Sequence, residues 1–152
     1  MVDAVLIVVH VLVALASTVT LALTAGYAVQ AARQGATSAV VQYFSAASSR
    51  VGRVLYLVPV FGVVLIALNR RGYGLDQLWL WSSFALWGIS AALAQTVVWP
   101  GEVTIATCLS DDCRAQDLRG IARQVGVAAA IATGCLVAGF PLMLFKPGAP
   151  GH

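Results

Sequence analysis

Residues 4–31 decide the fold class, and they read AVLIVVHVLVALASTVTLALTAGYAVQA. The stretch holds no charged residue and exceeds the roughly 20 residues that cross the hydrocarbon core of a bilayer as a helix. It shows no alternation with a period of two, and an open sheet would leave its backbone groups unpaired in lipid. We therefore predict a membrane-spanning helix over residues 4–31.

A cleaved signal peptide is the alternative for this stretch, because Ala14-Leu15-Ala16 supplies the small residues of a cleavage site. The positive residues that usually precede such a segment are missing, since Asp3 is the only charge there. The apolar residues also continue past the cleavage site as far as Val29. The pattern therefore favours an uncut spanning helix.

The composition of the whole chain agrees with a membrane protein. Of its 152 residues 60% are hydrophobic and 10% are charged, and the mean hydropathy is +0.88. An average soluble domain carries about 25% charged residues, and a small one cannot bury this much apolar surface. The net charge of +3 comes from residues at predicted helix ends rather than from one patch. The bilayer is therefore the expected partner, and a nucleic acid is not.

Three further apolar stretches predict spans over residues 54–68, 78–99 and 125–145. Pro100-Gly101 is expected to end the third helix and Lys146-Pro147 the fourth, because proline cannot continue a helix. The second span is short, and a re-entrant segment is its alternative. Residues 38–49 mix apolar and small polar residues, which is typical of an interfacial helix. We predict one transmembrane domain over residues 1–152, an all-α, integral membrane four-helix bundle with short loops.

Small residues recur every four positions in the fourth predicted helix, at Gly126, Ala130, Gly134 and Ala138. Helices in lipid associate through close backbone approach, so this spacing predicts an interhelical contact face. The third helix offers a partner face at Gly88, Ala92 and Thr96. In the first helix a seven-residue spacing predicts one polar stripe toward the bundle interior, formed by His10, Ser17 and Thr24.

Arginines and cysteines give opposite indications of topology. The first and third predicted loops hold Arg33, Arg50, Arg53, Arg114, Arg119 and Arg123, which favours cytoplasmic loops and termini outside. Cys108 and Cys113 also lie in the third loop, and a disulfide between them would need an oxidising compartment. A metal site of these thiolates with Asp111 and Asp112 is a further alternative. Ser110 is the expected N-cap of the fourth helix, and Cys135 is expected to pack inside it.

Candidate chemistry is sparse. His10 is the only ionisable residue inside a predicted span, and Gln95 is the only amide deep in one. The carboxylates all fall in predicted loops or at the N-terminus, and no nucleophile with a neighbouring base appears. We therefore expect no enzyme. Neutral imidazole is a common metal ligand, so His10 could bind haem b or copper, with hydrogen bonding across the bundle as the alternative.

Short pieces of the chain resemble a known group of small membrane proteins. They are His10-Val11-Leu12, residues 59–62, Trp99-Pro100 and residues 142–147. They are similar to the integral membrane family known as domain of unknown function 2269, which is related to copper-resistance D-like membrane proteins and to a haem-binding oxidase of porphyrin synthesis. The resemblance implies a four-helix membrane architecture and a haem or copper role for His10.

The sequence thus favours a non-catalytic accessory or structural subunit of a larger membrane complex, with a respiratory complex as the candidate. A haem- or copper-binding protein using His10 is the second hypothesis, and a small transporter is the third. Eight arginines against one lysine, with abundant alanine and glycine, are typical of a GC-rich bacterial genome. The expected location is the bacterial cytoplasmic (inner) membrane, with other membrane subunits as partners.

Overall fold

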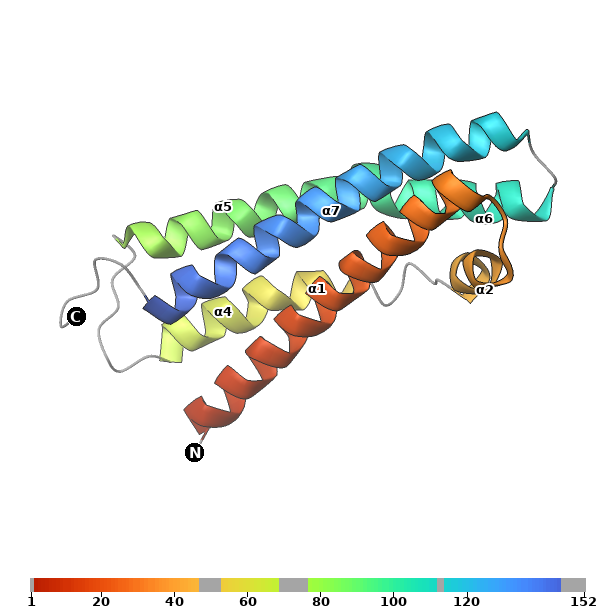
Figure 1. Cartoon of the computed structure of the whole chain (residues 1–152). Helices are drawn as coiled ribbons and strands as arrows, with labels where there is room; N and C mark the ends of the chain where they lie inside the picture. Colours follow the sequence, from red (N-terminus) through yellow and green to blue (C-terminus); the bar gives the residue numbers. More distant parts are fainter. Residues whose placement is uncertain (1, 47–52, 69–76, 112–113, 146–152) are drawn as a thin grey trace.

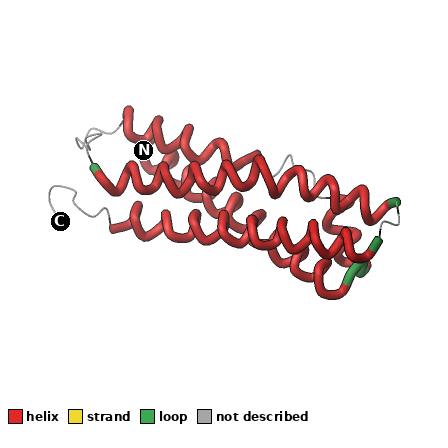
Figure 2. Tube along the Cα trace, turned by 90° about the horizontal axis from the view of Figure 1, so that it is seen from above, coloured by secondary structure: helices red, strands yellow, loops and turns green. Residues whose placement is uncertain are grey.

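The computed structural model describes residues 2–46, 53–68, 77–111 and 114–145, and every regular element in these ranges is a helix. The long helices run side by side along one axis, as Figure 1 shows. Viewed from above, the described loops lie at the ends of these helices (Figure 2). The all-α prediction is confirmed.

Within these described ranges, three helices are long and apolar enough to cross a membrane, namely residues 4–34, 78–110 and 115–145. The second predicted span is a shorter apolar helix, Arg53–Leu68, made of the 3-10 turn η1 (Arg53–Tyr56) and α4 (Leu57–Leu68). The helix α2 (Ser38–Ala46) adds a fifth helical segment, so four helices is an undercount. The prediction of a helical chain with helices suited to a membrane is confirmed. A fourth membrane crossing by α4 stays a prediction.

The first helix, α1 (Val2–Gln34), is followed by Gly35, whose left-handed backbone conformation other residues do not adopt easily. Gly35 has a φ of 76°, and its N–H donates to the carbonyl of Ala31 over 3.0 Å. Thr37 then begins α2, because its hydroxyl accepts the N–H of Val40. The turn directs α2 across the end of the bundle, where Figure 1 shows it nearly end-on.

The prediction that Pro100-Gly101 ends the third helix is wrong. The helix α5 (Leu78–Leu93) passes through a π-turn, η2 (Ala94–Val98), into α6 (Trp99–Ser110), and together they form one rod. In the π-turn the N–H of Trp99 donates to the carbonyl of Ala94, five residues back. Pro100 then lies in the first turn of α6, where a missing N–H costs little.

The fourth helix begins earlier than predicted. The helix α7 (Ala115–Phe145) starts well before Val125 and contains Pro141 within it. Ser110 is not its N-cap, because its hydroxyl donates over 2.9 Å to the carbonyl of Thr107 in α6. Ser110 therefore closes α6 instead of opening α7.

The helix α4 lies beside α1, and the turn η1 that precedes it is hydrogen-bonded to the rod. Pro59 has no N–H to offer the carbonyl of Leu55, four residues back. That carbonyl accepts the indole N–H of Trp87 over 3.0 Å. A donor from α5 thus satisfies a backbone group that the proline leaves unpaired.

The core between α1, the rod and α7 is built largely of alanine. Among the described residues, six alanines of α1, η2 and α7 are 0% exposed, namely Ala28, Ala31, Ala94, Ala122, Ala129 and Ala132. Such side chains let helix backbones approach closely, which is the main source of helix association in lipid. A Cβ on Gly101 would overlap Val125, at 2.2 Å from its Cγ2, so α6 and α7 approach each other closely there.

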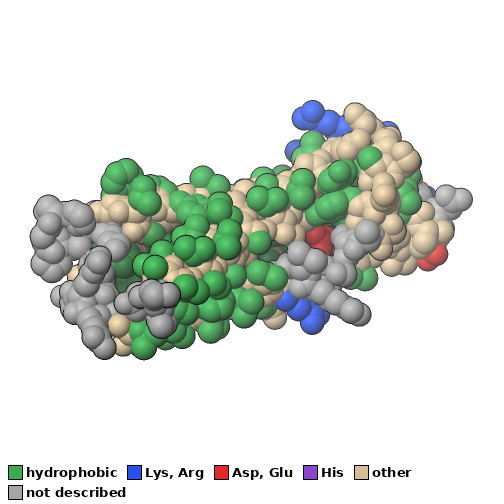
Figure 3. All heavy atoms as spheres, turned by 90° about the horizontal axis from the view of Figure 1, so that it is seen from below, with side chains coloured by type: hydrophobic (Ala, Val, Ile, Leu, Met, Phe, Trp, Pro, Cys, Tyr) green, Lys and Arg blue, Asp and Glu red, His purple; other side chains and the backbone are tan. Residues whose placement is uncertain are grey.

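The surface divides the bundle into two parts. Of the exposed large apolar side chains that the structure describes, nearly all lie on an apolar part, made of residues 5–23 of α1, α4, α5 and residues 127–145 of α7. The exceptions are Val29, Val41 and Val103. We call the remainder the polar end: residues 24–34 of α1, α2, α6 and residues 115–124 of α7. Figure 3 shows hydrophobic side chains along the apolar part and charged ones toward the polar end.

Candidate functional site

The predicted polar stripe of α1 faces inward. His10 is 8% exposed, Ser17 is 2% exposed and Thr24 is 1% exposed. Their seven-residue spacing places them on one side of the helix, and the prediction of an inward stripe is confirmed. Ser17 donates to the carbonyl of Val13 in its own helix, whereas Thr24 reaches two other helices.

Thr24 is the centre of a chain of three polar side chains, which we call the Glu102 triad: Glu102, Thr24 and Tyr43. The Thr24 hydroxyl donates to Glu102 Oε1 over 2.8 Å, and its oxygen lies 2.7 Å from the Tyr43 hydroxyl. Because a hydroxyl has one proton, a Thr24 that donates to Glu102 accepts its second hydrogen bond from Tyr43. The triad thus joins α6, α1 and α2.

Aromatic contacts hold Tyr43 in place. Its ring stacks on Tyr27 of α1 with a centroid separation of 4.2 Å and meets Phe44 edge-on at 5.1 Å. Phe44 and Val40 are buried, so the apolar face of α2 packs on the bundle rather than facing outward. Burial raises the pKa of the Tyr43 phenol, and the nearby Glu102 carboxyl raises it further, while the Thr24 hydrogen bond lowers it. Tyr43 therefore keeps its proton as a donor.

Glu102 is the unusual member, because it is a carboxyl group that is only 7% exposed. Within the described ranges no lysine or arginine forms an ion pair with it, and the Thr24 hydroxyl is its hydrogen-bond donor. Burying a carboxylate without a cation is costly, so such a group holds a proton readily or accepts a small cation. Chemically, the triad offers a buried carboxyl that can hold a proton, with a hydroxyl aimed at it.

The sequence interpretation missed this site because it ended the third helix at Pro100-Gly101 and left Glu102 in a loop. Two signals could have revealed it. Thr24 was already assigned to the inward stripe, and a buried hydroxyl needs a polar partner. Gly101 precedes Glu102 directly and permits the close approach to α7 that holds α6 against the bundle.

His10 lies against α4, near the backbone of Val58 and Gly62. A Cβ on Gly62 would lie 3.5 Å from the His10 Cε1 atom. The Nδ1 atom of His10 is buried and has no hydrogen-bond partner among the described residues. That free nitrogen suits a ligand atom, yet no group of three metal-ligating side chains gathers in the described ranges. The fit to a haem or copper group therefore rests on one ligand atom, His10 Nδ1.

The small residues of the predicted contact faces are placed differently from one another. Gly126 is buried against α1, where an added Cβ would lie 3.3 Å from Val29 Cγ2. The residues Ala130, Gly134, Ala138 and Ala92 are exposed, and Gly88 is half-buried with open space at its Cβ position. The two faces therefore do not pack on each other along their length. Instead Ser90 joins the rod to α7 by donating to the carbonyl of Ala132 over 2.9 Å.

The remaining predicted residues add no chemistry to the triad. Gln95 is exposed and accepts the hydroxyl of Tyr56. Cys108, in α6, is disulfide-bonded, and its predicted partner Cys113 lies outside the described residues, as does Asp112 of the alternative metal site. Cys135 is a half-buried free thiol in α7.

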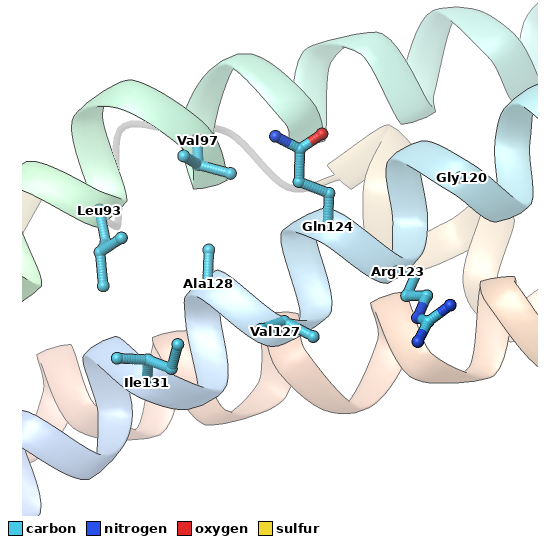
Figure 4. Close-up of a pocket in the computed structure, with 8 residues that line it drawn as sticks. All are labelled: Leu93, Val97, Gly120, Arg123, Gln124, Val127, Ala128 and Ile131. Atoms are coloured by element: carbon cyan, nitrogen blue, oxygen red, sulfur yellow. The ribbon is translucent and has the colours of Figure 1, made fainter.

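A groove of about 440 Å³ runs along the outer side of the bundle between the rod and α7, and we call it the α7 groove. Leu93 and Val97 form its rod side (Figure 4). Ala128 and Ile131 face them from α7, Gln124 points toward the rod, and Arg123 lies at the end of the groove away from Leu93 (Figure 4).

These features define a helical protein whose described residues include three helices long and apolar enough to cross a membrane, with a buried polar triad at one end. The chain matches no protein-family model, no curated protein and no solved structure. The resemblance to the copper-resistance D-like membrane proteins therefore stays a prediction.

Proposed function

We propose that this protein is a non-catalytic accessory subunit of a larger complex in the bacterial cytoplasmic membrane, with a respiratory complex as the candidate. The observation that supports this role is the outward position of its small residues. Ala130, Gly134 and Ala138 are exposed on α7, and Ala92 is exposed on α5.

A small residue on a lipid-facing surface gains little, because lipid chains fill the space that a larger side chain would occupy. Small residues instead allow a second helix to approach closely, which is how membrane helices associate. The chain's own helices leave this face of α7 open, since nothing lies within 4 Å of a Cβ at Gly134. A helix of another subunit is the partner that suits it.

Gly134→Leu tests the proposal, with Gly26→Leu as the matched control. Both glycines are exposed within long helices and have nothing within 4 Å of an added Cβ, so both variants should fold. Mild extraction from native membranes, a native gel and mass spectrometry of the band would identify a complex. We expect co-migration with other subunits for the wild type and for Gly26→Leu, and its loss for Gly134→Leu. Migration of the wild type as a lone monomer would contradict the accessory role.

A haem- or copper-binding role for His10 is the second candidate, and the unpartnered Nδ1 atom is the observation that favours it. The residue would hold haem b or copper through that nitrogen, and the bound group would supply redox chemistry. A visible spectrum and metal analysis of the purified protein test this role. A haem absorption band or stoichiometric copper that disappears in His10→Ala would support it. A colourless, metal-free and fully folded sample would remove it.

A small proton-linked transporter is the third candidate, and the Glu102 triad is the observation that favours it. Buried carboxyl groups in membrane proteins often serve as proton relays. Proteoliposomes with an internal pH dye would report proton movement, and Glu102→Gln would abolish it. Equal rates with the wild type and Glu102→Gln would count against this candidate.

The orientation that we propose places the termini outside, as the arginines favour. Arg33, Arg114, Arg119 and Arg123 lie at the polar end, which would then face the cytoplasm. The disulfide at Cys108 favours the opposite orientation, because it needs an oxidising compartment. A membrane-impermeant maleimide applied to whole cells, with and without a reductant, tests the orientation. Labelling of Cys108 only after reduction would overturn it.

A further inference from the structure

The α7 groove changes in character along its length. Arg123, Gln124 and Gly120 line one part of it, whereas Leu93, Val97 and Ile131 line another. At a rise of about 1.5 Å per residue, Arg123 and Ile131 lie about 12 Å apart along α7. The charged and polar mouth of this open groove therefore continues into an apolar part.

The groove lies where the surface of the bundle changes from apolar to polar. Exposed large apolar residues of α7 begin at Val127, and Arg123 precedes them by one helical turn. In a bilayer this boundary is the level of the headgroups, since the hydrocarbon core is about 30 Å thick and the long helices exceed it. The mouth is thus placed beside phosphates and the channel beside acyl chains.

The mouth carries uncompensated positive charge. Arg119 does not line the groove itself, but it lies one turn before Arg123 on the same side of α7, and both side chains are exposed. In the described part of the chain neither guanidinium forms an ion pair with a carboxylate. Guanidinium groups bind phosphate oxygens in pairs of hydrogen bonds, so the two arginines suit a phosphodiester.

We propose that the α7 groove binds one anionic phospholipid, with its phosphate at Arg123 and an acyl chain along Val97 and Ile131. A zwitterionic lipid suits the site less, because its ammonium group would approach two arginines. Gly120 at the mouth has nothing within 4 Å of its Cβ position, which leaves room for a headgroup. The basic mouth between two spanning helices is the kind of surface that binds anionic lipids. This inference does not depend on the accessory role.

The test uses the full-length protein, purified in a mild detergent and freed of lipid. Native mass spectrometry would measure binding of phosphatidylglycerol and of phosphatidylcholine with the same acyl chains. The variants are Arg123→Gln in the groove and Arg53→Gln as the charge-matched control, since Arg53 is exposed but does not line the groove. Gly120→Leu, which fills the mouth without removing a charge, is the second variant. Circular dichroism and size-exclusion chromatography check that each one folds.

We expect one phosphatidylglycerol to bind about tenfold more tightly than phosphatidylcholine, and both groove variants to weaken it about tenfold. Arg53→Gln should bind as the wild type does. Equal binding of the two lipids, or an equal loss in Arg53→Gln, would overturn the proposal. Displacement of the lipid by millimolar inorganic phosphate would also overturn it, because the site would then recognise a free anion.

Discussion

Replacing Thr24 by valine tests the Glu102 triad most directly. Valine has nearly the shape of threonine but no hydroxyl, so the packing of α1 is kept and two hydrogen bonds are lost. Those bonds measure 2.8 Å to Glu102 and 2.7 Å to Tyr43. The Glu102 carboxyl, which is 7% exposed, would lose its hydrogen-bond donor within the described structure.

The expected loss of stability can be worked out from these contacts. Leaving a buried polar group unsatisfied costs about 1–3 kcal/mol, and more when the group is charged. The Tyr43 hydroxyl is less buried and adds roughly 1 kcal/mol. We therefore expect Thr24→Val to lower the free energy of unfolding by about 3 kcal/mol. The helix α2 should also exchange its amide protons faster, because Tyr43 links it to α1.

The assay is unfolding in mixed detergent micelles, followed by circular dichroism, with hydrogen exchange of α2 measured in parallel. Thr20→Val is the matched control, because among the described residues the Thr20 hydroxyl bonds only to the carbonyl of Ala16 in its own helix. We expect it to change stability by less than about 0.5 kcal/mol. In a Glu102→Gln background the loss from Thr24→Val should differ from the loss in the wild-type background, because the two residues share a hydrogen bond and are therefore coupled. Equal losses for Thr24→Val and Thr20→Val would refute the reasoning.

Three further predictions follow from the packing and the titration of single residues. Because burial raises the pKa of Tyr43, its stabilising contribution is complete below about pH 10 and is lost as pH rises beyond it; alkaline unfolding curves of Tyr43→Phe should therefore fall less steeply than those of the wild type. Gly101→Ala should destabilise the fold by about 1–3 kcal/mol, and adding Val125→Ala should recover part of that loss in thermal unfolding. Trp87→Phe should cost about 1 kcal/mol, and Pro59→Ala should reduce this cost because it restores the backbone donor that the proline lacks.

Hydrophobic length and periodicity were enough to predict α1 and its inward stripe. The free energy of transferring an uncharged stretch into lipid depends on that stretch alone. The seven-residue spacing of His10, Ser17 and Thr24 places them on one side of the helix, whatever packs against it. For the same reason the apolar segments of α4, α5 and α7 were recognised as helices.

The small-residue face of α7 could not be placed from its spacing alone. Four residues turn a helix by about 400°, so a four-residue repeat drifts by about 40° at each step. Gly126 meets α1, but Gly134 and Ala138 have turned away from it and are exposed. The buried positions instead alternate steps of three and four, as in Val125, Ala129, Ala132 and Leu136.

The third helix shows why a proline rule fails locally. Proline breaks a helix because it removes a backbone hydrogen-bond donor. The π-turn before Pro100 changes the pairing of N–H and carbonyl groups, so a different set of carbonyls needs a donor there. A pattern of residue types does not reveal this, because the turn depends on how the rod packs against α7. A helix that ends at Pro100-Gly101 leaves Glu102 in a loop. The π-turn, which lets the helix continue, is therefore the backbone feature that sequence patterns would have to reveal before the candidate site could be predicted.

The position of the triad along the bundle explains how a buried carboxyl can be tolerated. Val5 and Thr24 lie about 28 Å apart along α1, close to the 30 Å thickness of the hydrocarbon core. If the hydrocarbon begins near Val5, Thr24 lies at its opposite boundary, and Glu102 is held there by protein rather than exposed to lipid. Burial of a charge costs less at that depth than at the bilayer centre. The triad, whose three members all belong to the polar end, would then lie beside the headgroups, at a level that protons from water can reach.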